Sequence, residues 1–233
     1  MNIQFPNKNV IVTGAAHGFG RAISLAFAQR GAVVWACDLL ADELQETWRL
    51  CLEAGGRCEV RAVDITSKDA VDAFVREAGH VDILVNNAGG VLGQVGQPLE
   101  NVTPEQWNAI FAVNVSGAFY LCQAVAPGMK AAKYGRIINI SSGAGLGISL
   151  TGIQAYASAK AALISLTRQL GHELGAWNIT VNCIAPGFVR SNPNTERQWQ
   201  SYGEEGQRKL VDGIALKRLG EAEDIAHGVL FFA

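Results

Sequence analysis

The 233-residue sequence has little that points to nucleic acid, a membrane or an oxidising compartment. Its 19 Lys and Arg side chains are balanced by 21 Asp and Glu, so a net charge of −2 provides no basic surface for nucleic acid or anionic lipid. Only five cysteines are present, scattered and without a Cys-x-x-Cys pair. We therefore expect buried reduced thiols, no metal site and a cytoplasmic protein.

Signals for targeting and for membrane insertion are also lacking. The first residues have neither the basic start nor the apolar core of a signal peptide, so we expect none. Residues 137–159 carry no charge over a length that could cross a bilayer, but they include four glycines and several Ser, Thr, Asn and Gln residues. This composition favours a buried strand followed by a polar, glycine-rich loop.

What is present is an alternation of apolar strands with amphipathic helices. Strands are expected at about 9–13, 32–37, 57–63, 82–86, 136–141 and 179–185. Helices are expected at about 18–30, 41–54, 67–79, 104–129 and 155–176. No change of composition marks a linker. The pattern predicts one α/β domain over 1–233, a doubly wound parallel sheet of the Rossmann type.

A glycine-rich turn joins the first strand to the first helix. Gly14, Gly18 and Gly20 let the backbone approach a pyrophosphate, and the helix that follows offers its N-terminal N–H groups to the phosphates. Asp38 ends the second strand 18 residues after Gly20. A carboxylate there suits the ribose hydroxyls of NAD and repels the extra phosphate of NADP, and His17 is a weak partner for that phosphate. We therefore predict NAD over NADP.

Tyr156 and Lys160 lie four residues apart and would share one face of a helix. A cation near a phenol favours the phenolate and lowers its pKa. Such a tyrosine could exchange a proton with an alcohol or a ketone near neutral pH. The pair alone is weak evidence, because it also occurs by chance.

These residues belong to a set of motifs whose order resembles that of the short-chain dehydrogenase/reductase family. They are TGAAHGFG (13–20), NNAG (86–89), NVSG (114–117), INISS (138–142), YASAK (156–160) and PG (186–187). The resemblance covers essentially the whole chain. It implies an NAD(P)-dependent oxidoreductase that interconverts secondary alcohols and ketones.

The resemblance implies a catalytic tetrad. Tyr156 would be the acid/base, and Lys160 would lower the pKa of Tyr156 and bond the nicotinamide ribose. Ser142 would hold the substrate oxygen, with Ser141 as the competing serine. Asn114 would connect Lys160 to a water chain.

The cofactor-binding residues implied in the same way follow several strands. They are Gly14, His17, Gly18, Phe19, Gly20, Asp38, Leu39, Asp64, Ile65, Asn87, Ala88, Gly89, Tyr156, Lys160, Pro186, Gly187, Val189 and Ser191. Asp64 and Ile65 would flank the adenine, Leu39 would lie beside the adenosine ribose, and Val189 would contact the carboxamide.

The substrate is less determined. Residues 188–212 are polar, aromatic and charged, as a lid over a polar substrate would be. With Ser142 and Tyr156, Gln154 and Arg190 are the candidate substrate contacts, although Arg190 could equally be a solvated lid residue. We therefore expect a small polar substrate, a sugar, polyol or sugar acid. The alternative enzyme is a 3-oxoacyl-thioester reductase, and the alternative of another class is a catalytically silent binding protein.

Two expectations concern the whole molecule. The sequence ends in an apolar helix, whereas the family usually continues with a seventh strand, so this strand either is missing from the protein or is absent only from this sequence. The family resemblance implies a homo-oligomer, a tetramer or dimer, which the missing strand puts in question.

Overall fold

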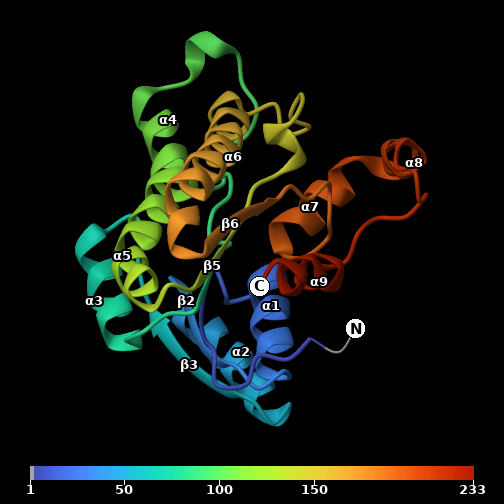
Figure 1. Ribbon diagram of the computed structural model, residues 1–233. Helices are drawn as coiled ribbons and strands as arrows, with labels where there is room; N and C mark the ends of the chain where they lie inside the picture. The colour runs from blue at the N-terminus through green and yellow to red at the C-terminus, as the bar shows by residue number, and fades with distance from the viewer. Residues whose placement is uncertain (1–2) are drawn as a thin grey trace.

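The computed structural model describes residues 3–233 and has a six-stranded parallel sheet at its centre, in the order β3-β2-β1-β4-β5-β6 (Figure 1). The strands are β1 (Asn9–Thr13), β2 (Val33–Asp38), β3 (Arg57–Ala62), β4 (Ile83–Asn86), β5 (Gly135–Ile140) and β6 (Ile179–Ile184). The apolar runs of the central strands β1, β4 and β5 are buried on both faces, as a parallel sheet requires, whereas the edge strand β3 is partly exposed. The predicted fold class is confirmed.

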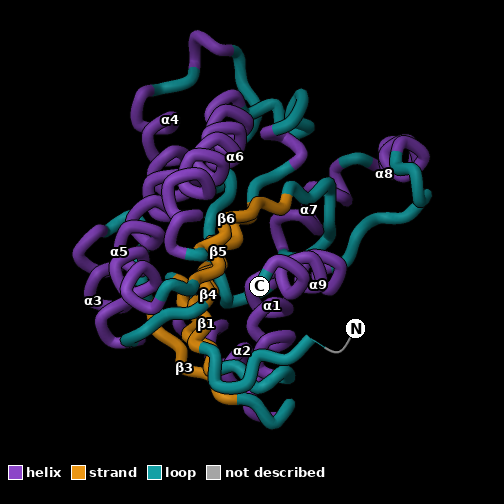
Figure 2. Tube along the Cα trace, in the orientation of Figure 1, coloured by secondary structure: helices purple, strands orange, loops and turns teal. Residues whose placement is uncertain are grey.

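Helices cover both faces of the sheet, which Figure 2 shows nearly edge-on. One layer holds α1 (Gly18–Ala28), α2 (Ala41–Glu53) and α9 (Ala222–Phe232), and the other holds α3 (Lys68–Ala78), α5 (Gly117–Ala132) and α6 (Gln154–Leu174). Phe27, Leu44 and Val229 belong to the first core, and Phe74 and Leu121 to the second. Outside these layers are α4 (Pro104–Phe111), α7 (Pro193–Ser201) and α8 (Gly203–Gly213).

The strand order reverses between β1 and β4, which are neighbours in the sheet. The connection from β1 runs to one side and the connection from β4 to the other, so the loops at their carboxyl ends separate. In open α/β sheets ligands bind in the crevice that this reversal creates. The fold thus places the glycine-rich turn and the loop after β4 on either side of one crevice.

A buried chain of amides fixes α6 against the sheet. Asn86 and Asn139 are register partners in β4 and β5, and the Asn86 amide donates to Asn139 Oδ1 over 2.8 Å. The Asn139 amide donates in turn to Thr167 Oγ1 on α6, over 2.9 Å. All three side chains are buried, where paired hydrogen bonds are strongly favoured over unpaired groups. This chain helps to set the position of the helix that carries Tyr156.

The expected continuous helix over 104–129 is wrong in its middle. It begins as predicted, with a capping box of Thr103 and Gln106 and a proline at its first position. Residues 112–116 then form a π turn between α4 and α5, and Asn114 lies in this turn. The tertiary reason is the hydrogen bonding of Asn114 to Gly90, described below. Single π turns inside helices are frequent at functional sites.

The segment Pro104–Ala132 is long and apolar enough to cross a membrane by length and composition. Its residues Leu121, Val125 and Met129 are buried in the core beneath the sheet. Core helices of globular proteins pass the same test, so the segment is no more than weak evidence for a membrane span.

Candidate active site

The turn between β1 and α1 has the shape that its glycines permit. Gly14 and Gly18 have φ of +65° and +57°, values that side chains rarely adopt. A Cβ at Gly20 would overlap the carbonyl oxygen of Gly14, so the helix could not pack this closely on the turn with any other residue. Helix α1 then begins with its N–H groups at the crevice. This is a cradle for a pyrophosphate.

The loop after β4 is bound directly to this turn. The Thr13 hydroxyl accepts hydrogen bonds from the backbone N–H groups of Asn87 and Ala88, at 3.0 and 2.9 Å. The Asn87 amide donates to the carbonyls of Thr13 and Gly14, at 2.9 and 3.0 Å. Asn87 and Ala88 therefore build the crevice wall. Thr13 was not among the predicted site residues, although a hydroxyl at the end of β1 could have suggested it.

Asp38 stands at the end of β2 beside the turn. One carboxylate oxygen accepts from Ala16 N (3.1 Å), and the other accepts from the N–H groups of Leu39 and Leu40 (2.7 and 3.2 Å). The carboxylate thus holds the turn and the start of α2 in addition to its predicted place at the ribose. Leu39 is exposed next to it.

Arg21 and Thr47 support the turn from behind, and sequence reasoning missed both. The buried Thr47 hydroxyl, on α2, donates to Ala15 O over 2.7 Å and accepts from Arg21 Nε over 3.1 Å. The Arg21 guanidinium also donates to the carbonyls of Ala16 and Glu43. No sequence motif marks these residues, because the contact depends on how α2 packs against α1.

Two further cofactor candidates have structural partners. His17 precedes α1 as its N-cap residue, and its Nε2 lies 3.9 Å from a Glu43 carboxylate oxygen. Phe19 packs against the core on the α1 side of the sheet.

Asp64 and Ile65 lie at the next strand end along the sheet, after β3. Asp64 accepts from the backbone and hydroxyl of Thr66, at 2.8 and 2.7 Å. Ile65 is buried against Gly117, where a Cβ would come within 2.6 Å of its Cδ1. Its side chain therefore packs on α5, which leaves its backbone as the part that could line an adenine site.

Tyr156 and Lys160 occupy the first turns of α6, and Ser142 follows β5. The Lys160 ammonium lies 5.7 Å from the centre of the Tyr156 ring and donates to Ile140 O over 3.0 Å. Ser142 is a hydrogen-bonding neighbour of the Tyr156 phenol. Ser141 instead donates to the Lys160 carbonyl over 2.8 Å and is buried. The two serines therefore have different neighbours: Ser141 bonds the backbone of α6, and Ser142 faces the phenol.

The predicted lowering of the Tyr156 pKa by Lys160 is not found in the structure. Burial raises the pKa of the Tyr156 phenol, the hydrogen bond with Ser142 opposes the rise, and Lys160 makes no contribution to the shift. Burial also lowers the pKa of Lys160 to about 8. The physical reason is that Lys160 loses its proton at a lower pH than the phenol does, so no positive charge remains beside the phenol when it ionises.

Asn114 contacts the loop after β4 and not the lysine. Its amide donates to Gly90 O (2.8 Å) and Ile110 O (2.9 Å), and its Oδ1 accepts from Gly90 N (3.0 Å). A Cβ at Gly89 would lie 2.6 Å from Asn114 Oδ1 and 3.3 Å from Lys160 Nζ. Gly89 thus lets the two side chains approach the same backbone.

The segment after β6 closes the crevice from the other side. Pro186 O accepts from Gly143 N over 2.8 Å, which joins this segment to the loop that follows Ser142. Gly187 is exposed, and Val189 is buried and pairs with Gly220. Ser191 lies at the phosphate turn, since a Cβ at Gly18 would come within 2.8 Å of its carbonyl oxygen.

Two of the four predicted substrate contacts, Gln154 and Arg190, already have partners within the protein. The Gln154 amide donates to Gln97 O over 2.9 Å. The Arg190 guanidinium forms two hydrogen bonds with Glu196, at 2.8 and 3.0 Å, and lies over the Trp199 ring. Arg190 is thus held by an ion pair on the lid, and Gln154 by the loop that carries Gln97.

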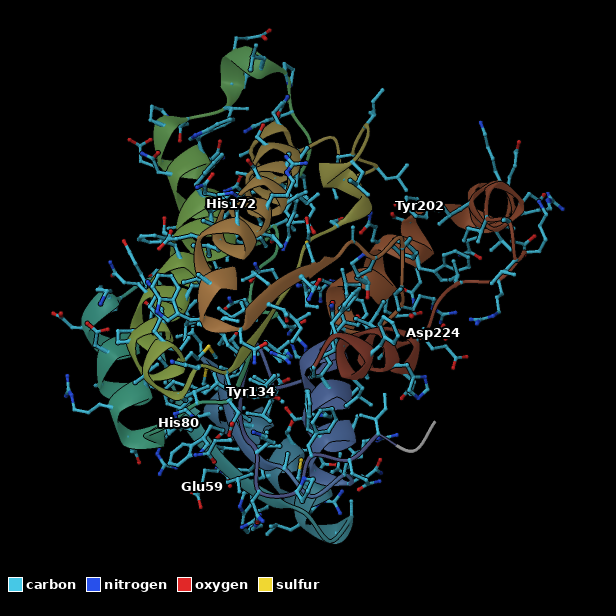
Figure 3. The ribbon with its side chains drawn as sticks, viewed as in Figure 1. Glu59, His80, Tyr134, His172, Tyr202 and Asp224 are labelled. Carbon is cyan, nitrogen blue, oxygen red and sulfur yellow. The ribbon has the colours of Figure 1, made fainter. Side chains whose placement is uncertain are left out.

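The lid segment folds on itself through an aromatic stack. Phe188 stacks on Trp199 with ring centres 6.0 Å apart and meets Tyr202 at 5.7 Å. Figure 3 labels Tyr202 at the start of α8, beside the body of the sheet. The expected lid over 188–212 is thus two helices, α7 and α8, held at their base by these rings.

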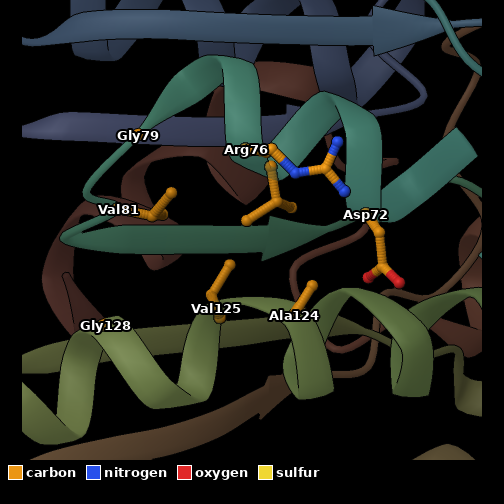
Figure 4. A pocket seen from close by; sticks show the side chains of 8 residues that line it. Asp72, Arg76, Gly79, Val81, Ala124, Val125 and Gly128 are labelled. Carbon is orange, nitrogen blue, oxygen red and sulfur yellow. The ribbon is translucent and has the colours of Figure 1, made fainter. Parts of the chain in front are cut away.

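A separate hollow of about 350 Å³ lies between α3 and α5 (Figure 4). Gly79 and Val81 line it near the amino end of β4, so it is remote from the strand ends that carry Ser142 and Asp38. Within residues 3–233, no group of three or more His, Cys, Asp or Glu side chains is arranged to hold a metal ion.

The arrangement is a dinucleotide cradle beside a serine, a tyrosine and a buried lysine. A family model described as "short chain dehydrogenase" matches residues 8–201. The chain belongs to the short-chain dehydrogenase family.

Relatives within this family differ in substrate and in cofactor. The chain is 38% identical to the (2S)-[(R)-hydroxy(phenyl)methyl]succinyl-CoA dehydrogenase subunit BbsD of Thauera aromatica, over 100% of this chain and 91% of the relative. Among solved structures, NAD⁺-bound xylitol dehydrogenase is 30% identical, with a TM-score of 0.89 over 98% of this chain and 92% of that one. A 3-oxoacyl-[acyl-carrier protein] reductase from Brucella melitensis with bound NAD is 33% identical (TM-score 0.88; 99% and 86%). An actinorhodin polyketide ketoreductase variant with NADPH is 27% identical (TM-score 0.88; 97% and 90%).

Proposed function

We propose that this short-chain dehydrogenase interconverts a secondary alcohol and a ketone with NAD, and that Tyr156 is its proton donor and acceptor. The observation that carries the proposal is the meeting of Tyr156, Ser142 and Lys160 at one end of the sheet, beside the glycine-rich turn. The tetrad and cofactor roles assigned from the family motifs are part of this proposal.

The residues present fit a dinucleotide. The left-handed Gly14 and Gly18, the close packing at Gly20 and the N-terminus of α1 form a cradle that any side chain would fill. When bound, the nicotinamide accepts or supplies the hydride. Asn87, Ala88 and Gly89 would line one side of the crevice and the segment from Pro186 to Ser191 the other. Residues 188–212 would form the lid.

The chain's own contribution is the handling of the proton. In alcohol oxidation the substrate hydroxyl would give its proton to the Tyr156 oxygen, with Ser142 bonding the same substrate oxygen. In ketone reduction the phenol would return it. With a pKa of about 8, Lys160 can change its protonation near physiological pH, which suits a group that passes the proton onward. Asn114 would hold the loop at Gly90 in place beside it.

Asp38 supports NAD over NADP. Its carboxylate sits at the end of β2 next to the phosphate turn, where a ribose 2′-phosphate would meet like charge. Arg21 is the nearest cation that the turn offers, and its guanidinium is bonded to Thr47 and to backbone carbonyls.

One observation favours the hypothesis of a polar substrate, and another counts against it. The likeness to xylitol dehydrogenase favours a polyol. Gln154 and Arg190, two of the predicted substrate contacts, are instead bonded within the protein. The alternative, a 3-oxoacyl-thioester reductase, is not excluded by a preference for NAD, since the Brucella reductase carries NAD.

The proposal is tested with a panel of sugars, polyols, sugar acids, hydroxyacyl thioesters and simple secondary alcohols, each assayed with NAD and with NADP. Turnover of at least one secondary alcohol, faster with NAD, is the expected result. Binding of NADH without turnover of any member would instead support the catalytically silent binding protein.

We also propose that copies of the chain associate into a homo-oligomer. Trp107 on α4 and Phe119 on α5 are partly exposed aromatic side chains on the outer side of the second helix layer. Sedimentation would give a multiple of the 24.8 kDa chain mass if copies associate, and the chain mass itself if they do not.

A further inference from the structure

Two loops frame the mouth of the active site. Residues 91–98 follow the loop that contains Gly89 and Gly90, and residues 143–153 connect Ser142 to the helix of Tyr156. We call these segments the rim loops. They touch each other, because a Cβ at Gly96 would come within 2.9 Å of Thr151 O. The segment that joins Ser142 to Tyr156 therefore borders the place where a substrate oxygen would reach both residues.

The rim loops contain no charged residue, and their polar side chains bond within the protein. The Gln94 and Gln97 amides both donate to Gln106, one to its backbone carbonyl and one to its side chain, at 3.0 and 2.7 Å. The Ser149 and Thr151 hydroxyls bond each other at 2.7 Å, and both also cap nearby backbone N–H groups. A sugar would thus find few unengaged hydrogen-bonding side chains on this wall.

Five apolar side chains of the rim loops are exposed to solvent, whereas Ile153 is buried. Ile148 is fully exposed, and Leu146 and Leu150 are 72% and 67% exposed. On the other rim loop, residues 91–98, Leu92 and Val95 are 57% and 76% exposed. Contiguous exposed apolar side chains are uncommon on globular proteins and usually mark a binding surface. Here three of them lie on the segment that joins Ser142 to Tyr156, and two lie on the loop in contact with it.

We infer that the rim loops bind a neutral apolar substituent of the substrate, an alkyl or aryl group attached to the reacting carbinol carbon. The inference rests on the proposed function and names its substrate class. It replaces the sugar or sugar acid expected from the sequence. The charge pattern selects this occupant: no cation of the rim loops could pair with a carboxylate or phosphate, and Arg190 is paired with Glu196.

The test is a series of ketones reduced with NADH: butanone, 2-hexanone and 2-octanone, with dihydroxyacetone and xylulose as polar members. Each methylene buried against the rim should raise kcat/KM about two- to fourfold. We expect 2-octanone to exceed butanone by at least tenfold and to exceed both polar ketones. A flat or falling series, or a preference for xylulose, would overturn the inference.

Two substitutions in the rim loops and one control distinguish a substrate contact at the rim from a general loss of activity. Ile148→Ser and Leu150→Ser should each lower kcat/KM for 2-octanone by about threefold or more while leaving butanone within twofold. Phe231→Ser, at a side chain of similar exposure on α9, is the matched control and should change neither ketone. Equal losses for both ketones would count against a rim contact. Absence of turnover with every ketone and alcohol would overturn the proposed function itself.

Discussion

At the scale of single residues, burial decides the chemistry more than proximity does. Tyr156 and Lys160 are neighbours on one helix face, yet burial moves the pKa of Tyr156 up and that of Lys160 down. The spacing of the two residues is visible in the sequence. The direction of the shifts is not, because it depends on how much protein covers each group.

The lowered pKa of Lys160 has a consequence for stability. Between pH 8 and its ordinary value of 10.5, the unfolded chain holds more protons at this site than the folded one. Folding stability from this group therefore rises with pH across that window and is lost as pH falls through 8. Relative to Lys160→Met, the wild type should gain on the order of 2 kcal/mol between pH 7 and 10.

Urea unfolding of both proteins at the two pH values measures this gain. The difference between the two proteins cancels groups that titrate elsewhere in the chain. A difference that stays constant with pH would mean that the folded lysine titrates normally.

Asp38 combines two roles that one substitution can separate. Asp38→Asn keeps an acceptor oxygen for the turn but removes the charge that opposes a 2′-phosphate. We expect the ratio of kcat/KM for NADP to that for NAD to rise at least tenfold. Asp38→Ala also removes the acceptor, so it should weaken both cofactors. A ratio unchanged in Asp38→Asn would show that another group excludes the phosphate.

At the scale of elements, the helix and strand periodicities predicted the existence and order of the sheet and its two helix layers. The helices expected at about 67–79 and 104–129 begin within a residue of those positions, after the Ser67 cap and the Thr103 capping box. The π turn at Asn114 was missed, because it is held by Gly90, 24 residues away. Contacts between elements leave no periodic trace in one sequence.

The hydrogen bond from Thr47 on α2 to the glycine-rich turn is also a contact between elements, and one substitution tests it. Thr47→Val keeps the shape of the buried side chain but leaves Ala15 O without its donor. We expect KM for NAD to rise several-fold with kcat within twofold of the wild type. Thr180→Val, at an exposed threonine of β6, is the control. A fall in kcat with an unchanged KM would contradict a role in positioning the turn.

At the scale of the whole molecule, the motif order predicted the family, which the family model confirms. Ser142 follows β5, Tyr156 and Lys160 lie on α6, and Asn114 lies in the π turn between α4 and α5; their catalytic roles stay a prediction. The substrate could not be predicted in the same way. Its specificity depends on which loop side chains are bonded internally and which are exposed, as the contrast between Gln97 and Ile148 illustrates.

The preference between NAD and NADP can also be measured through the melting temperature of the whole protein. A ligand that binds only the folded chain stabilises it by an amount that grows with its concentration over its Kd. At equal millimolar concentrations, NAD should raise the melting temperature more than NADP does. Equal shifts, or a larger shift with NADP, would contradict the assignment of Asp38.

The central claim is that Tyr156 transfers the proton, and one substitution tests it most directly. Tyr156→Phe removes only the phenolic oxygen, so NADH should still bind, as titration of its fluorescence would show. Measured on the same preparation with the best substrate of the panel, kcat should fall by at least a thousandfold. Activity within tenfold of the wild type, with NADH still bound, would contradict the account.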